Sequence, residues 1–430
     1  MKEKNHEVIV VGAGPSGSTA AYLLAKNGIS TLLLERGAYP GSKNVFGGNI
    51  YSKPTAEIIP GFWKEAPIER PVTREELWLM EEESCIKMGF TGLRFSKPPY
   101  NKLIVKRSEI DSWLAEKAEQ EGALLQCNTL VKKLSQEKNK TGVITSRGEV
   151  IPAEAVILAE GVNSLLTYQN RMRKELAADK MTLYVKEVLE LPAVTIEERF
   201  QLDKDQGAII GIIGYPTAGA PGRGGIWTNR DTISLIVGSY LDQIVDKGLN
   251  PFHLLQRTKK HPLISPLLAG SRLLEYQAHL IPKGGYYSLP RLYRDGILVV
   301  GDAAMMISGR RGTDLAMLSG KIAAETIIQA RARGSYTAQN LALYQQKISD
   351  SFFFKDIKAK RGFPQYRKKH PDADLLISKT ANTVAHNLFE VDLKTEKSKE
   401  QQIIKTLSNL QPPIKSINDL VSGLKHWEAF

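Results

Sequence analysis

Cysteine is scarce in this sequence. Only two occur among 430 residues, Cys85 and Cys127. A four-thiolate iron–sulfur cluster or an all-cysteine zinc site therefore cannot be built from this chain alone, and any such cluster must belong to a partner. So few thiols in so long a chain also indicate a reducing compartment, where a disulfide framework is neither needed nor favoured.

Long apolar runs are lacking as well. The stretches at residues 208–215 and 296–307 are interrupted by Gly or Asp, and they fall short of the ~20 residues that a spanning helix needs. The N-terminus lacks the apolar region and the cleavage site of a secretory signal. We therefore expect a cytoplasmic protein, with at most a peripheral contact on the inner face of the cell membrane.

Familiar motifs for metal or nucleophilic chemistry are also missing, since no H-E-x-x-H, C-x-x-C or G-x-S-x-G pattern occurs. The 42% hydrophobic and 24% charged residues are typical of a globular protein. The length predicts two or three domains. Lys and Arg outnumber Asp and Glu by 58 to 46, and the net charge of +12 favours an acidic partner without identifying it.

The most informative segment runs from residue 7 to 37. The continuous β-branched run at residues 8–11 predicts a buried parallel strand, residues 18–26 a helix ending near Gly28, and residues 30–34 a second strand. Gly12, Gly14 and Gly17 occupy the positions of a G-x-G-x-x-G turn between strand and helix. The first allows the tight turn, the second lets the backbone approach a pyrophosphate, and the third lets the helix pack on the strand.

An acid follows at the expected place. Glu35 lies 35 − 17 = 18 positions beyond the last glycine, at the end of the second strand, where a carboxylate accepts hydrogen bonds from an adenosine ribose. We therefore predict an adenine-dinucleotide site. It includes the turn residues Ala13, Pro15 and Ser16, with Arg36 beside the acid. This motif does not distinguish NAD from FAD.

A second segment, residues 295–334, favours FAD. Residues 297–300 predict a buried strand, Asp302 follows it, and an alanine-rich helix begins near Asp314. An Asp at this position can bond a sugar-alcohol chain, which FAD has and NAD lacks. The helix N-terminus at Gly312 and Thr313 could face the pyrimidine end of the flavin, where negative charge accumulates on reduction.

At this point the sequence resembles a family. LAEG at 158–161 and GDAA at 301–304, with the segments above, look like the FAD-binding motifs of the glutathione-reductase and hydroxybenzoate-hydroxylase types. More narrowly, the chain resembles the FixC proteins, relatives of the electron-transfer-flavoprotein:quinone oxidoreductases. This resemblance covers roughly residues 5 to 345 and is carried by KNVFGG at 43–48, IIPGF at 58–62, RSEIDSWLAEKAEQEGA at 107–123, VILAEGVNS at 156–164, VKEVLELP at 185–192, RFQLDKDQGA at 199–208 and HLIPKGG at 279–285.

The resemblance implies an α/β fold: a Rossmann-like FAD-binding domain with an inserted β-rich substrate domain and a C-terminal helical cap. We expect strands at residues 183–189, 207–214, 225–229 and 232–239 of the insertion. The expected boundaries are 1–75, 100–170 and 285–335 for the FAD domain, 76–99 and 171–284 for the substrate (quinone) domain, and 336–430 for the cap.

The resemblance also places further residues at the cofactor. Arg107 corresponds to a position near the FAD pyrophosphate or ribityl chain, with a solvated arginine at a helix start as the alternative. Gly47, Gly48 and Gly161 match backbone positions near the flavin. Glu160 departs from the usual Asp, so its role is left open.

The loop from Ala304 to Gly312 departs more strongly from the family, because it is shorter than in FixC relatives. Arg310 and Arg311 in this loop could hold a flavin anion, or they could form a solvated basic loop. The shortening also keeps open a flavin-poor subunit that serves only as a structural part of an electron-transfer complex.

The expected function is an FAD-dependent transfer of electrons from an electron-transfer flavoprotein to a quinone, in a Fix-type complex with a ferredoxin-like FixX partner. No catalytic side chain, metal site or nucleic-acid partner is expected. No second G-x-G-x-x-G opens a helix after a strand, so a dedicated NAD domain is not expected. An FAD-dependent polyprenyl reductase and an aromatic hydroxylase remain alternatives.

A basic run at residues 355–369 holds seven Lys or Arg and one acid, and follows three phenylalanines at 352–354. A solvated face is the plain interpretation. The functional interpretations are an anionic membrane surface, with aromatic insertion, and an acidic ferredoxin-like partner.

Overall fold

The computed structural model describes residues 6–42, 48–137, 140–283, 285–309, 311–370, 372–410, 412 and 415. The chain divides into two compact units, each assembled from three separate stretches of chain. The first unit comprises the residues up to 68, then 105–180 and 281–361. The second comprises 69–104, 181–280 and the residues from 362 onward.

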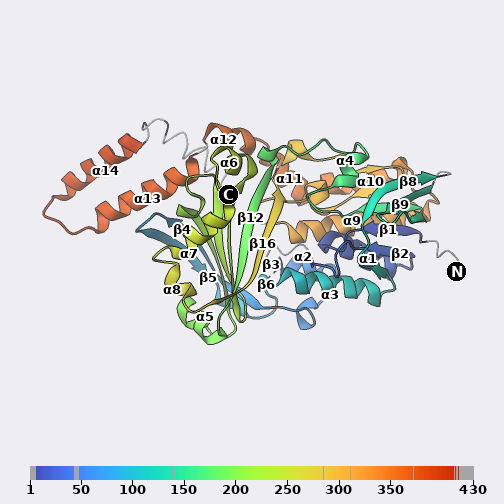
Figure 1. Cartoon of the computed structure of the whole chain (residues 1–430), viewed down its shortest axis with the longest axis horizontal. Helices are drawn as coiled ribbons and strands as arrows, with labels where there is room; N and C mark the ends of the chain where they lie inside the picture. The colour runs from blue at the N-terminus through green and yellow to red at the C-terminus, as the bar shows by residue number, and fades with distance from the viewer. Residues whose placement is uncertain are drawn as a thin grey trace. The chain divides into compact units, whose positions relative to one another are not determined.

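A largely parallel sheet forms the centre of the first unit, in the order β17-β18-β11-β1-β2-β7. Figure 1 labels β1 and β2 of this sheet. The four middle strands are buried along their whole length. Coverage of both faces explains why they are runs of Val, Ile, Leu and Ala, with a single Thr, rather than alternating patterns. The six strands are β1 (Val8–Val11), β2 (Thr31–Leu34), β7 (Leu124–Gln126), β11 (Ala155–Leu158), β18 (Ile297–Val299) and the antiparallel β17 (Tyr293–Arg294).

Three helices pack together in this unit: α1 (Pro15–Lys26) contacts both α3 (Arg107–Gln120) and α9 (Thr313–Ala332). The approach of α9 to α1 requires Gly320, where a Cβ atom would lie 2.2 Å from the Ser16 carbonyl oxygen. The other elements of the unit are β3 (Asn49–Tyr51), α2 (Ser52–Ala56), β8 (Val131–Glu137), β9 (Lys140–Thr145), β10 (Val150–Ala153), α4 (Leu165–Gln169), α10 (Ala338–Asp350) and α11 (Phe352–Ala359).

The second unit is built on a long mixed sheet. The expected strands are all found, as β12 (Met181–Glu190), β13 (Gly207–Gly214), β14 (Gly222–Thr228) and β15 (Thr232–Tyr240). Their apolar side chains form one core with α5 and α7. The remaining elements are β4 (Arg70–Met80), β5 (Cys85–Thr91), β6 (Lys102–Ile104), α5 (Ala193–Phe200), α6 (Leu241–Asp246), α7 (Pro251–Lys260), α8 (Ser265–Leu268), β16 (Arg272–Pro282), α12 (Phe363–Lys369), α13 (Ala373–Phe389) and α14 (Glu396–Leu410).

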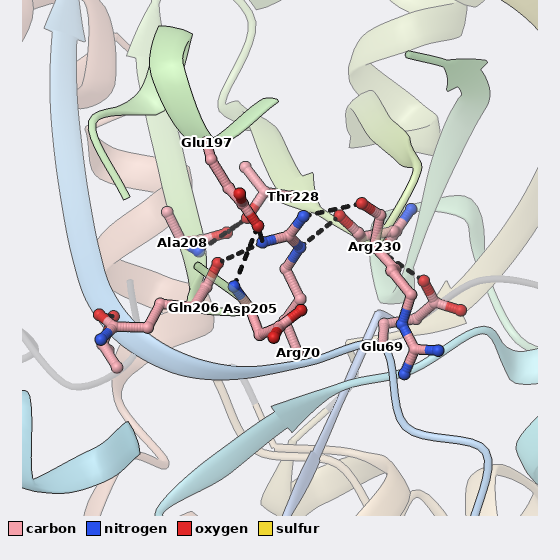
Figure 2. A network of polar contacts seen from close by, with 10 residues as sticks. Glu69, Arg70, Glu197, Asp205, Gln206, Ala208, Thr228 and Arg230 are labelled. Carbon is pink, nitrogen blue, oxygen red and sulfur yellow. Dashed lines mark hydrogen bonds and ion pairs between the residues drawn. The ribbon is translucent and has the colours of Figure 1, made fainter. Parts of the chain in front are cut away.

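A buried arginine at the start of β4 ties these strands together (Figure 2). Arg70 is 1% exposed, and its Nε and Nη2 donate to the carbonyl oxygens of Asn229 and Arg230 at 2.9 and 2.7 Å. Its Nη1 donates to the Gln206 carbonyl at 3.0 Å and to Glu197 Oε1 at 2.6 Å. One side chain thus anchors the α5–β13 loop and the β14–β15 turn, and one of its partners, Gln206, lies in the RFQLDKDQGA segment.

The C-terminal segment is helical, as expected, but it does not form a third unit. Its residues up to 361 belong to the first unit, where α10 packs against α9, and those from 362 onward belong to the second. There α13 lies against β4 and β13, and Ser378 Oγ donates to the Met80 carbonyl at 3.0 Å. Buried polar contacts of this kind attach the helices to their neighbours. Within the described ranges no helix is long and apolar enough to cross a membrane.

Candidate cofactor site

The three glycines of the turn after β1 differ in what requires a glycine at each position, either a close contact within the protein or space for a ligand. Gly12 has φ +106°, and a Cβ there would lie 2.3 Å from the Ala159 carbonyl oxygen. A Cβ at Gly17 would lie 1.9 Å from the Gly12 carbonyl oxygen. At Gly14, however, φ is −80° and a Cβ would meet no atom within 4 Å. The protein itself therefore requires the outer two glycines, whereas the middle one faces open space at the N-terminus of α1, where a phosphate can approach the backbone.

Glu35 is oriented by the same turn. The Ala13 N–H donates to Glu35 Oε2 at 3.0 Å, and the Gly37 N–H donates to Oε1 at 2.6 Å. The carboxylate is thereby held at the carboxyl end of β2 beside the start of α1, which Pro15 opens. This is the place from which an acid bonds an adenosine ribose. Ser16 is buried in the first turn of α1, and the Arg36 side chain is exposed.

Arg107 is not a solvated arginine. It is 7% exposed, and its Nε and Nη2 donate to Asp111 Oδ1 and Oδ2 at 2.7 and 2.8 Å, in a bidentate pair along α3. Burial lowers the pKa of the guanidinium, but the Asp111 carboxylate more than offsets it, so the net pKa is raised and the charge is retained. The guanidinium also acts electrostatically on Asp302, so the structure brings these two predicted residues together.

Asp302 follows β18 in a short 3-10 helix, Gly301–Ala304. Burial raises the pKa of its carboxyl, and the charges of Arg107 and Lys283 oppose this rise. The side chain is half-buried, and among the described residues it has no hydrogen-bond donor. A carboxylate that is enclosed, faces two cations and still lacks a donor fits the hydroxyl groups of a ribityl chain.

Glu160 has a clear role that the sequence left open. Its Oε2 accepts from the Leu166 N–H at 2.8 Å, and its Oε1 accepts from the N–H and hydroxyl of Thr167, both at 2.7 Å. These bonds cap the N-terminus of α4, so the extra methylene relative to Asp serves a structural contact. The neighbouring Gly161 has φ +73°, with open space where a Cβ would be.

The shortened loop is a formed turn. The Ser308 N–H donates to the Arg311 carbonyl at 3.0 Å, and the Arg311 N–H donates to the Ser308 carbonyl at 2.9 Å. The Arg311 guanidinium pairs with Asp314 in the first turn of α9, with Nε to Oδ2 at 2.7 Å, and lies 4.5 Å from the centre of the Phe352 ring. Its charge is therefore compensated within the protein. Gly312 and Thr313 begin α9 directly after this turn.

Two of the predicted positions lie outside the described residues, Gly47 and Arg310. Gly48 is described, and its carbonyl accepts from the Val105 N–H at 3.0 Å. Lys283 is not among the predicted site residues, although it stands in a segment that carries the family resemblance. No local pattern identifies it, because the Gly309 carbonyl that it contacts and the Asp302 carboxyl on which it acts are distant in sequence from β16.

Comparison with known proteins shows the family to which this chain belongs. A protein-family model described as an FAD binding domain matches residues 5–198. The FixC protein of Bradyrhizobium diazoefficiens is 40% identical over 420 residues, covering 95% of this chain and 96% of that protein. The FixC protein of Azotobacter vinelandii is 39% identical over 426 residues, covering 98% of each. The chain belongs to the FixC family.

Solved structures show the same fold at lower identity to this FixC protein. A geranylgeranyl bacteriochlorophyll reductase-like protein from Thermoplasma acidophilum is 20% identical, with a TM-score of 0.72 and coverage of 97% of this chain and 99% of that one. The halogenase PltM in complex with phloroglucinol and FAD is 14% identical, with a TM-score of 0.63 and coverage of 94% and 83%. FAD is the cofactor of this FixC protein, which is an FAD-dependent oxidoreductase.

The residues described above fit FAD along its length. The open space at Gly14 and the N-terminus of α1 suit its pyrophosphate, Glu35 its ribose, and Asp302 its ribityl chain. The bound flavin supplies the electron-transfer chemistry. The side chains described above would bind and orient it, and Arg107 with Asp111 forms a buried, internally neutral pair that acts electrostatically on Asp302.

Proposed function

We propose that this FixC protein takes electrons from an electron-transfer flavoprotein and passes them to a quinone. The observation that carries the proposal is that its single dinucleotide site is built for FAD. Glu35, Gly14 and Asp302 are used by that cofactor, and the sequence holds no second fingerprint for NAD. Electrons must then arrive from another protein or from a bound substrate. The resemblance to electron-transfer-flavoprotein:quinone oxidoreductases supports the first source.

The test is an anaerobic, stopped-flow measurement on the full chain with FAD bound. A reduced electron-transfer flavoprotein should bleach the flavin absorbance, and a short-chain quinone should then restore it. The Gly14→Val variant, prepared without FAD, is the matched control for electron transfer that bypasses this site. Failure of the reduced flavoprotein to bleach the bound flavin would sink the proposal.

The same measurement separates the alternatives. Direct bleaching by NAD(P)H that a substrate accelerates would favour an aromatic hydroxylase. Consumption of a polyprenyl double bond would favour a reductase, the activity that appears in the name of the Thermoplasma acidophilum protein. A folded, colourless protein that still assembles with partners would favour a structural subunit. A visible spectrum, with the flavin identified after denaturation, distinguishes this last case.

A ferredoxin-like FixX-type partner and an anionic membrane surface complete the proposal. The two cysteines cannot supply a cluster, so an iron–sulfur carrier has to be another chain. The structure reduces the number of residues in the basic run that could contact a membrane. Phe353 and Arg367 are buried, and Arg367 lies 3.9 Å from the centre of the Tyr240 ring. Phe352 and the exposed lysines remain available, so the membrane contact that we propose uses these residues and not the buried Phe353.

A further inference from the structure

Lys283 directly follows β16 and belongs to the first unit. Its backbone is fixed by the bond from its N–H to the Lys180 carbonyl oxygen at 2.7 Å. Its half-buried side chain reaches the turn after Asp302, where Nζ donates to the Gly309 carbonyl at 3.3 Å. The ammonium group therefore joins two segments of the cofactor site that are distant in sequence.

The charges that act on Asp302 show what the Lys283 ammonium group contributes to the cofactor site. Arg107 and Lys283 are the two cations that act on the Asp302 carboxyl. The charge of Arg107 is already matched by the bidentate Asp111 carboxylate. Loss of the Lys283 ammonium alone would therefore remove one positive charge from the surroundings of Asp302.

We propose that Lys283 is a cofactor-positioning residue whose ammonium group, bonded to the Gly309 carbonyl oxygen in the turn before α9, favours the reduced form of the bound FAD. Reduction adds negative charge to the flavin, and the removal of a positive charge from the surrounding site would oppose it. The α9 N-terminus follows the same turn and contributes only a partial positive charge. The proposal requires FAD alone and is independent of the electron donor and acceptor.

The test compares Lys283→Gln, Lys283→Met and Lys283→Arg with the full-length wild type. Gln removes the charge but keeps a hydrogen-bond donor, Met removes both, and Arg keeps both. The dissociation constant of FAD is measured in the oxidised form and after reduction by dithionite, and the midpoint potential is measured against reference dyes. Lys132→Met, which removes an exposed lysine on β8, is the matched control.

In Lys283→Gln and Lys283→Met we expect the reduced form to lose about tenfold more affinity than the oxidised form. This corresponds to a shift of the two-electron potential by about 30 mV toward negative values. Arg should restore most of the difference, and the control should show none. Equal weakening of both forms would show a purely structural role and would overturn the proposal, as would an unchanged ratio. If Met prevents folding, the Gln variant decides.

Discussion

Gly14→Val should abolish or weaken FAD binding while leaving the apoprotein folded. Gly14 has φ −80° and ψ −176°, which is extended backbone that valine adopts readily. Apart from its neighbours along the chain, no atom of the described residues lies within 4 Å of the added Cβ. The side chain therefore fills only the space that the pyrophosphate would occupy.

The expected magnitudes follow from these contacts. Loss of the glycine N-cap costs roughly 0.5–1 kcal/mol, and the lower entropy of the unfolded chain returns a similar amount. The unfolding free energy of the apoprotein should thus change by about 1 kcal/mol or less. Each charge-assisted hydrogen bond lost by the pyrophosphate costs roughly 1.5–3 kcal/mol, so the FAD dissociation constant should rise roughly 10- to 100-fold or more.

The assay has two parts: FAD titration of the apoprotein by fluorescence quenching, and urea unfolding of the same sample. Gly17→Ala is the contrasting variant, because its Cβ would lie 1.9 Å from the Gly12 carbonyl oxygen. It should lower stability and FAD affinity together. Wild-type FAD affinity in a folded Gly14→Val protein would refute the assignment of this turn to the cofactor. Loss of FAD accompanied by unfolding would refute the separation of roles between the two glycines.

Three further variants test other parts of the structure. Asp302→Ala should lower flavin occupancy more than it alters the pH dependence of turnover of the remaining flavin, because the carboxyl has a binding role; the opposite pattern would make it the proton donor. Arg70→Met should lower the unfolding free energy by about 3–5 kcal/mol, because it removes the cation paired with Glu197 and the donor of three carbonyl groups; urea unfolding monitored by tryptophan fluorescence checks this, and a change below 1 kcal/mol would contradict it. Replacement of three exposed lysines by Ser should weaken co-sedimentation with anionic liposomes at low salt and leave neutral liposomes unaffected, whereas unchanged binding would exclude an electrostatic membrane role for Lys355, Lys358 and Lys369.

The cofactor site shows which features a local sequence pattern can predict and which it cannot. The turn at Gly12, Gly14 and Gly17 could be predicted because the strand, the turn, the helix and the acid lie within one short segment. The role of Glu160 could not, since a carboxylate that caps the next helix looks the same in sequence as one that faces a cofactor. The basic run shows the same limit. Its charge density was evident, but the burial of Arg367 against Tyr240 and Asp242 depends on how α12 packs.

By itself, the sequence determined the class of cofactor, some of the strands of each unit and the scarcity of cysteine ligands for a cluster. Each of these depends on residue type or on spacing along a continuous stretch of chain. The tertiary structure decided which groups share one electrostatic environment. Asp302 follows β18, Arg107 opens α3 and Lys283 follows β16, so these three residues influence one another only because the folded chain brings distant segments together. The division of the C-terminal helices between the two units likewise follows from buried polar contacts such as that of Ser378 with the Met80 carbonyl, which no periodicity in the sequence reveals.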